Sequence, residues 1–184
     1  KNFDLRSTVA AQSNHPHWGD VARQLLANGL NKARDGHDAG DHPPITPVRG
    51  ATESEVGGGN HWMLFDMVTR HFLATLSPDC KFLRTKVKLS AGTEEFSLAG
   101  RKVLDPGFTA VSRSGDMADV SIPDFRVGET FKLQGVSTNT YETKPPPYLS
   151  ESDILGLMEK NGIGTDASMA THINNICERN YVNL

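Results

Sequence analysis

Two histidines and two aspartates stand close together in residues 36–47, between glycines on one side and prolines on the other. Imidazole and carboxylate groups at this spacing can transfer protons or contact a phosphate, because histidine titrates near neutral pH. Glycine lets the backbone approach a ligand closely, whereas proline fixes φ and restrains the residue before it. His42, which directly precedes Pro43, therefore has a defined position, and we predict that it is presented to a substrate.

Two interpretations of His42 are open from these residues alone. In the structural one, the imidazole belongs to a capped turn and is hydrogen-bonded to Asp38 or Asp41. In the functional one, either carboxylate orients the imidazole and raises its pKa, which favours a cation near neutral pH. That cation can contact a phosphate or protonate a leaving oxygen.

A second place for chemistry is the turn at residues 162–166, where glycines lead into the start of a helix. Free N–H groups and the helix dipole favour an anion there, usually phosphate. Asp166 argues against this, since a carboxylate in the first turn can occupy the same field. The helix has a polar stripe of Ser168, His172, Asn175 and Arg179 and an apolar stripe of Met169, Ile173 and Ile176. The outline also fits a DNA-reading helix-turn-helix, although many proteins with it bind no DNA.

Other chemistries find less support in the sequence. Six of the seven histidines lie in the first 71 residues, but none has the paired spacing of a zinc site, and neither cysteine has a nearby cysteine partner. A metal-dependent hydrolase built on these histidines would need bound zinc, and we expect no metal ligands in this chain. No serine or cysteine stands in a nucleophile elbow such as G-x-S-x-G.

Length, composition and charge limit what these candidate sites can be. A chain of 184 residues can form one good core or two to three small lobes. The net charge of −3 gives no overall basic signal, so a nucleic-acid site must be a local patch. The two separated cysteines suit reduced, intracellular thiols, and no apolar run approaches the roughly 20 residues that span a bilayer. Because the chain begins without Met or a signal-peptide pattern, we expect an internal piece of a longer protein.

Helical periodicity dominates residues 1–78. One helix, followed by Gly29 as its stop signal, carries Trp18, Val21, Leu25 and Leu26. Thr52 and Glu55 form a capping-box pattern that three glycines separate from the next segment. The strongest helix is predicted from Asn60 to Ser77 as a core helix, with an apolar stripe of Phe65, Val68, Phe72 and Leu76.

The period changes from 3.6 to 2 between Cys80 and about Val136. One face of the predicted first strand carries Leu83, Thr85, Val87 and Leu89, and the other carries Arg84, Lys86 and Lys88. A turn at residues 91–94 leads to a second strand around residues 96–103, and residues 131–136 are a third strand candidate. The stretch from Ser112 to Asp124 is predicted to be an exposed loop. The basic face is either simply solvated or a nucleic-acid contact.

A proline-rich connector at residues 144–147 precedes a predicted helix pair. Ser150 is the N-cap of the first helix, with Asp153 in its first turn, and Gly162 ends it. Its apolar stripe consists of Ile154, Leu157 and Met158. Thr165 caps the second helix, which runs to about Arg179.

Two long motifs resemble those of eukaryotic type IA DNA topoisomerases. They are Gly-His-Asp-Ala-Gly-Asp-His-Pro-Pro-Ile-Thr-Pro at residues 36–47 and Leu-Met-Glu-Lys-Asn-Gly-Ile-Gly-Thr-Asp-Ala at residues 157–167. Residues 15–18 and 172–182 look most like the topoisomerase III-beta branch. The resemblance covers nearly the whole chain and is weakest between Ser112 and Asp124.

The resemblance implies an α+β fold that is part of a larger enzyme. Residues 1–78 would be a helical gate lobe, the C-terminal part of the nucleophile-bearing domain. Residues 79–143 would be an antiparallel β arch of the toroid, and residues 144–184 a partial, helical lobe that binds single strands. The intact enzyme would relax or decatenate nucleic acid: a tyrosine attacks a phosphodiester, another strand passes through the gap, and the break is resealed.

The site residues implied by the resemblance divide into two groups. His42 falls on the active-site histidine that positions and stabilises the scissile phosphate. The nucleic-acid contacts of the binding lobe fall on Thr165, Asp166, Ser168, His172 and Arg179. The nucleophilic tyrosine, in a Tyr-Pro-Arg-Thr-like motif, and the Toprim domain with its Mg²⁺ ligands lie outside this chain. We therefore expect the chain alone to be inactive.

The resemblance also implies partners and a location. Single-stranded DNA and RNA are the expected nucleic acids, without a membrane, in the nucleus and also the cytoplasm. An alternative is a protein-docking module, in which the loop from Ser112 to Asp124 binds a Tudor-domain partner.

Overall fold

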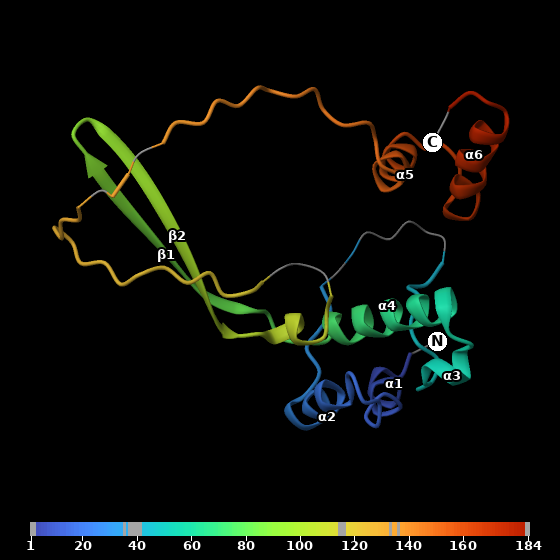
Figure 1. Cartoon of the computed structure of the whole chain (residues 1–184). Coiled ribbons are helices and arrows are strands. Elements are labelled where there is room, and N and C mark those ends of the chain that lie inside the picture. Colours follow the sequence, from blue (N-terminus) through green and yellow to red (C-terminus); the bar gives the residue numbers. More distant parts are fainter. Residues whose placement is uncertain are drawn as a thin grey trace. The chain divides into compact units, whose positions relative to one another are not determined.

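The computed structural model describes residues 3–34, 36, 42–113, 117–132, 134–135 and 137–182, which fall into two units, residues 1–130 and 131–184. The first unit holds helices, a β-hairpin and a short 3₁₀ helix, and the second holds two helices (Figure 1). In order, the elements are α1 (Leu5–Ala10), α2 (Gly19–Asn28), α3 (Glu53–Val56), α4 (Gly59–Thr75), β1 (Lys81–Ala91), β2 (Glu94–Asp105), η1 (Gly107–Ala110), α5 (Glu151–Lys160) and α6 (Asp166–Glu178). The predicted α+β class is confirmed.

The core of the first unit lies between α1, α2 and α4. Its buried side chains are Val9, Trp18, Ala22, Leu25, Phe72, Leu73, Leu76 and Val111. The predicted long helix is confirmed at α4, where Phe72 and Leu76 are buried and Phe65 and Val68 are half-buried. Gly29 ends α2 with φ +95°, as its position predicted.

The capping box at the start of α3 also forms as predicted. The backbone N–H of Thr52 donates to Oε2 of Glu55 at 2.7 Å, and this hydrogen bond lowers the pKa of the Glu55 carboxyl. Gly57 adopts a left-handed conformation, φ +96°, and stops the helix after a single turn. Gly57 and Gly58 thus separate α3 from α4, which begins at Gly59.

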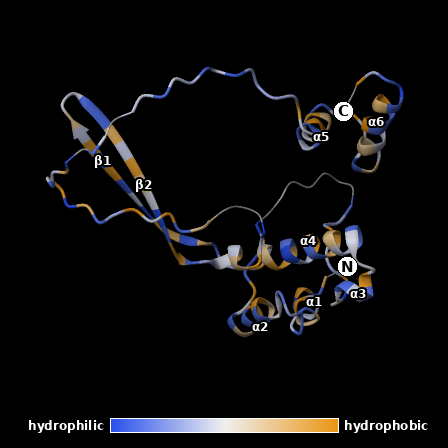
Figure 2. Cartoon of the chain, in the orientation of Figure 1, coloured by the Kyte–Doolittle hydropathy of each residue, from blue (hydrophilic) through white to orange (hydrophobic). Residues whose placement is uncertain are grey.

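The predicted hairpin is confirmed, with strands longer than expected. Its antiparallel register pairs Val87 with Leu98 and Leu89 with Phe96. Gly92 makes the turn at φ +63°. Figure 2 shows apolar and polar residues alternating along both strands. Directly paired residues share a face, so these four apolar side chains lie on one side of the sheet.

The third strand predicted at residues 131–136 is wrong for the described part of that range, where residues 131, 132, 134 and 135 have no regular structure. Instead, Val120 pairs with Arg101 at the outer edge of β2, through N–H···O bonds of 2.8 and 3.0 Å. Asp119 accepts a further bond at 2.7 Å from the N–H of Val103. The described residues of the predicted loop from Ser112 to Asp124 are therefore exposed or half-buried, and part of the loop is bonded to the hairpin. It pairs there because the outer edge of β2 has backbone groups that need hydrogen-bond partners.

The second unit consists of α5 and α6. Ser150 caps α5 as predicted: its N–H donates to Asp153 Oδ2 at 3.0 Å, and the Asp153 N–H donates back to Ser150 Oγ at 3.2 Å. The Ser150 hydroxyl also donates to the Asp153 carboxylate, and this bond is the main cause of the lowered pKa of Asp153. The predicted apolar stripe needs one correction. Leu157 is 42% exposed, while Leu155 joins Ile154 and Met158 as half-buried, because these three lie within one 100° arc of the helix.

Candidate nucleic-acid interface

His42 lies exposed in a segment without regular secondary structure that continues through the prolines. The chain returns to the lobe at Pro47, which is buried. Asp38 and Asp41, the carboxylates predicted to orient the imidazole, lie outside the described residues. Pro47 is five positions after His42, a reach of at most about 18 Å. The chain from Pro47 to Gly50, which we call the anchor, therefore limits how far His42 can lie from the helical lobe.

Gln12 holds that anchor. Its fully buried side chain donates from Nε2 to the carbonyl oxygen of Arg49 at 3.0 Å and accepts from the indole N–H of Trp18 at 3.2 Å. Gly50 packs so closely on the turn after α1 that an added Cβ would lie 2.1 Å from the Ala11 oxygen. The segment is thus fixed by backbone contacts. The sequence analysis missed Gln12, since its bonding partner is 37 residues away.

An aromatic stack lies next to this anchor. The His15 ring stacks on Trp18 with centroids 3.6 Å apart and planes 10° apart, and Trp62 stacks at 5.6 Å from His15. Burial is the main cause that lowers the pKa of His15, helped by the positive field of His17 and Arg70 and opposed by Asp66. His15 is therefore a packing residue that favours its neutral form.

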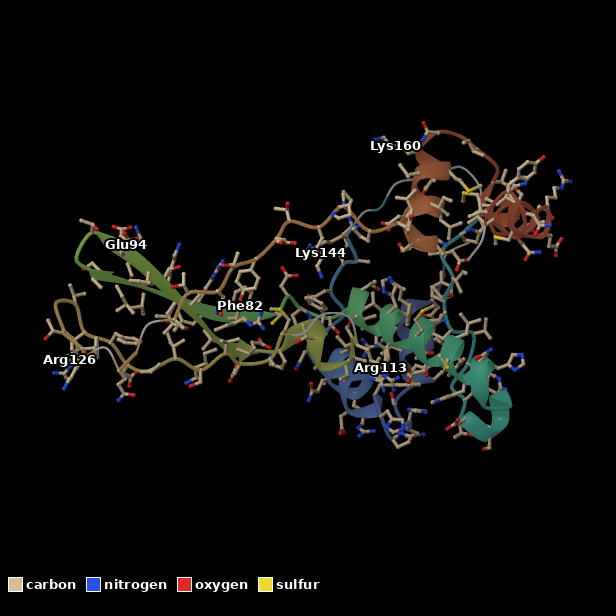
Figure 3. The ribbon with its side chains drawn as sticks, turned by 45° about the horizontal axis from the view of Figure 1, so that its top comes forward. Phe82, Glu94, Arg113, Arg126, Lys144 and Lys160 are labelled. Atoms are coloured by element: carbon tan, nitrogen blue, oxygen red, sulfur yellow. The ribbon has the colours of Figure 1, made fainter. Side chains whose placement is uncertain are left out.

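An ionic cluster around the buried Asp66 carboxylate joins α4 to the segment after η1. The carboxylate of Asp66, 5% exposed, meets Arg70 Nε at 2.9 Å and Arg113 Nη1 at 3.5 Å. Arg70 also donates to the carbonyl oxygen of Val111 at 3.1 Å. Figure 3 labels Arg113 beside α4. This network holds the chain that leaves the hairpin against the helical lobe.

The basic face of the hairpin forms as the alternation predicted. Arg84 lies opposite Arg101, Lys86 opposite Ala99 and Lys88 opposite Ser97, and the three β1 side chains are exposed. The Arg101 guanidinium is bonded to the carbonyl oxygen of Ala118 at 2.8 and 3.1 Å. Figure 3 marks the hairpin by Phe82 near its base and Glu94 at its tip. This geometry suits both a solvated face and a contact with phosphates.

At the start of α6, the structure brings three of the predicted contact residues together. Thr165 donates its N–H to Ser168 Oγ at 2.8 Å. Gly164, at φ +77°, packs so closely that an added Cβ would lie 3.0 Å from both Ser168 Oγ and the His172 ring. Thr165, Ser168 and His172 therefore surround this glycine turn.

The two remaining residues of this predicted site are placed differently. Asp166 accepts the Ala167 N–H at 2.9 Å, so its carboxylate occupies the helix N-terminus in the way that argued against an anion there. Arg179 is the C-cap of α6, about 21 Å along the helix from Thr165, and so lies apart from the glycine turn.

No helix of the described residues is long and apolar enough to span a bilayer. An exposed histidine, a basic strand face and a polar helix stripe are features that proteins contacting nucleic-acid backbones share. The family model described as DNA topoisomerase matches residues 1–184, and the chain belongs to this family.

Individual relatives narrow the branch. The chain is 49% identical over 183 residues to DNA topoisomerase 3-beta-1 of Mus musculus and of Homo sapiens, and 49% identical over 181 residues to DNA topoisomerase 3-beta of Arabidopsis thaliana. The matches cover 98–99% of this chain and 21% of each relative. The resemblance to type IA topoisomerases of the III-beta branch is confirmed. The chain spans about a fifth of the length of these relatives.

Proposed function

We propose that this chain is the gate-and-arch part of a type IA topoisomerase, which relaxes or decatenates nucleic acid by transient single-strand cleavage and strand passage. The observation that carries the proposal is the exposed His42 on a segment that Gln12 and Gly50 anchor to the helical lobe. Family membership along the whole chain supports the same reaction. The division into a gate lobe (1–78), an arch (79–143) and a binding lobe (144–184) is part of this proposal.

His42 has the role of a phosphate contact. An exposed imidazole can donate a hydrogen bond to a non-bridging phosphate oxygen or give a proton to a leaving oxygen. The anchor at Arg49 and Gly50 limits how far this imidazole moves, which favours a defined geometry at the scissile phosphate. The tyrosine nucleophile comes from outside these 184 residues, so the chain alone does not cleave.

Magnesium is proposed for the intact enzyme only. Among the described residues, no three His, Cys, Asp or Glu side chains come together as a metal site. For the intact enzyme we propose that the Mg²⁺ ligands belong to the Toprim domain.

The C-terminal helix pair has the role of a backbone contact for single-stranded DNA or RNA. Thr165, Ser168 and His172 offer hydroxyl and imidazole groups around one glycine turn, and Arg179 offers a guanidinium at the far end of α6. Asp166 stays among the proposed contacts, and its carboxylate accepts the Ala167 N–H in the first turn of α6. Contacts to the backbone tolerate most sequences, as a topoisomerase of general use requires. The proposed location is the nucleus and also the cytoplasm.

The test is His42→Ala in the intact enzyme. We expect slower cleavage and religation with an unchanged melting temperature, because the side chain is exposed. His61→Ala, an exposed histidine on α4, is the matched control and should keep its activity. Relaxation rates equal to wild type in the His42 variant would remove His42 from the mechanism.

A second proposal is protein docking at the loop between Ser112 and Asp124, with a Tudor-domain partner. The observation in its favour is Val120, which is 48% exposed at the outer edge of β2. Deletion of residues 116–124 should abolish capture of a Tudor-domain protein and leave single-strand binding intact. Capture that survives this deletion would exclude the loop.

A further inference from the structure

A cleft of about 730 Å³ lies in the first unit, at the root of the hairpin. One wall is the extended segment after α2, the floor is the C-terminal end of α4, and the opposite wall is the chain on either side of the hairpin. The polar and aromatic side chains that line it and matter here are Lys32, Arg34, His71, Asp79, Lys81 and Phe108. None of these belongs to the sites described above.

Contacts between segments distant in sequence hold this cleft open. The Asn31 N–H donates to the Leu76 carbonyl at 3.0 Å, which fixes the first wall to the end of α4. The Phe108 N–H donates to the Pro78 carbonyl at 2.8 Å. Gly107, at φ +49°, packs so tightly that an added Cβ would lie 2.5 Å from the carbonyl oxygens of Pro78 and Asp79. The cleft is therefore preformed by backbone geometry.

The charges in the cleft favour an anion. Lys32, Arg34 and Lys81 bring three cations from two separate walls, and His71 adds an imidazole from the floor. Among the described lining residues, Asp79 is the acidic one, and it forms an ion pair with Arg34 at 2.9 Å. Both partners of this pair are largely exposed, so the pair is weak and an incoming anion can compete for the guanidinium.

We propose that this cleft binds the phosphodiester backbone of a single nucleic-acid strand, with a base against Phe108. A volume of about 730 Å³ exceeds what one phosphate fills and lies in the usual range of ligand sites. A cationic groove beside an aromatic ring is the combination that holds single strands without reading sequence. The proposal rests on the proposed function only for the choice of a nucleic-acid strand. It adds a binding site whose described lining residues do not include His42.

The test measures the binding of a fluorescent oligothymidine to the complete 184-residue chain across a salt series. Arg34→Gln with Lys81→Gln should weaken binding and lower the slope of log affinity against log salt by about 0.7 for each phosphate that the chain no longer neutralises. Asp79→Asn should act in the opposite direction, because it removes a carboxylate that repels phosphate and frees Arg34. Opposite effects from neighbouring residues are hard to produce by unfolding.

The matched control is Arg126→Gln with Lys132→Gln, an equal loss of charge at exposed positions that do not line the cleft. It should retain the wild-type slope. Phe108→Leu keeps an apolar side chain but removes the stacking surface, and should weaken binding by about tenfold with the salt slope unchanged. Thermal unfolding of each variant reports whether the fold is intact.

Three results would overturn the proposal. The first is wild-type affinity and slope in the Arg34/Lys81 variant, which would remove the cleft and leave the roles of His42 and α6 standing. The second is an equal loss in the control variant, which would mean attraction to charge in general. The third concerns inorganic phosphate. If phosphate alone saturates the cleft, and the Arg34/Lys81 variant binds phosphate more weakly but binds the oligonucleotide like wild type, the cleft is a site for a small anion. A wild-type chain that binds no oligonucleotide at low salt would overturn both the cleft and the proposed single-strand contact of α6.

Discussion

The two units place their candidate contact residues by different means. In the first unit, Trp18, Leu73 and Leu76 are at most 1% exposed, and the segment after His42 is tied to fully buried Gln12. In the second unit, the most covered of the described side chains are only half-buried, and Thr165 and Ser168 meet because they lie three residues apart on one capped turn. Tertiary packing positions the first site, and local sequence positions the second. Substitutions should therefore affect the two units unequally.

The largest difference is expected for core truncation. Leu73→Ala removes a fully buried side chain from the first unit and should cost about 2–5 kcal/mol of unfolding free energy, the usual range for such a cavity. Ile173→Ala, at a half-buried position of α6, should cost less than about 2 kcal/mol, because less apolar area returns to water. Urea unfolding followed by tryptophan fluorescence and by helical circular dichroism measures both. Equal costs would mean that α6 is as well buried as the first core.

A smaller effect, confined to the His42 segment, is expected for Gln12→Ala. The change leaves the Arg49 carbonyl and the Trp18 indole N–H without their partner and should cost about 1–3 kcal/mol. Hydrogen exchange of the amides at residues 48–51 should become faster, while exchange in α5 and α6 should not change.

The control for Gln12 keeps the volume and removes only the bonds. Gln12→Met should speed exchange at residues 48–51 nearly as much as Gln12→Ala does. If Gln12→Met exchanges like the wild type, volume rather than hydrogen bonding holds the segment, and the anchor assigned to Gln12 is wrong.

The same contrast explains how much of the structure the sequence could predict. The caps at Thr52 and Ser150 and the alternation around Val87 were predicted, because each depends on residues within a few positions. The predictions of a strand at residues 131–136 and of Leu157 in the apolar stripe of α5 were wrong. A neighbouring element decides which edge of a strand is paired and which arc of a helix is covered. The residue that pairs with the outer edge of β2 is Val120 instead.

The candidate site divides in the same way. The helical period correctly predicted that Ser168 and His172 lie together. It also placed Arg179 on the same stripe, but a shared stripe does not imply proximity, and Arg179 lies at the opposite end of α6. The anchor of the His42 segment could not be predicted, since a glutamine that bonds across 37 residues has no local pattern. The cleft at the hairpin root is equally invisible in sequence, since its cations come from segments far apart in the chain.

A cap in the second unit should have a modest and local effect. Ser150→Ala removes the hydroxyl that accepts the Asp153 N–H and should destabilise α5 by about 1 kcal/mol. Ser150→Asp restores an acceptor and should recover most of that loss. Helical circular dichroism and hydrogen exchange at residues 151–154 measure it. An effect that spreads into α1, α2 or α4 would contradict the view that local sequence alone holds this helix.

The smallest effect is a pH dependence that belongs to the first unit alone. Burial against Trp18 lowers the pKa of His15 below 6.5, so the unfolded chain binds this proton more readily than the folded one. The contribution of His15 to stability is then complete above about pH 6.5 and is lost as the pH falls through the lowered pKa. Glu55 and Asp153, with lowered pKa values, contribute stability that is present above their ordinary values of 4.5 and 3.8 and is lost at lower pH, outside this window.

The test replaces His15 by Phe, which keeps the stack and removes the titration. The unfolding free energy of His15→Phe should vary less between about pH 7 and 5 than that of wild type, whereas His61→Phe should keep the wild-type dependence. Urea unfolding at intervals across that range decides it, and parallel curves for His15→Phe and wild type would show that the stacked imidazole is not the group that titrates.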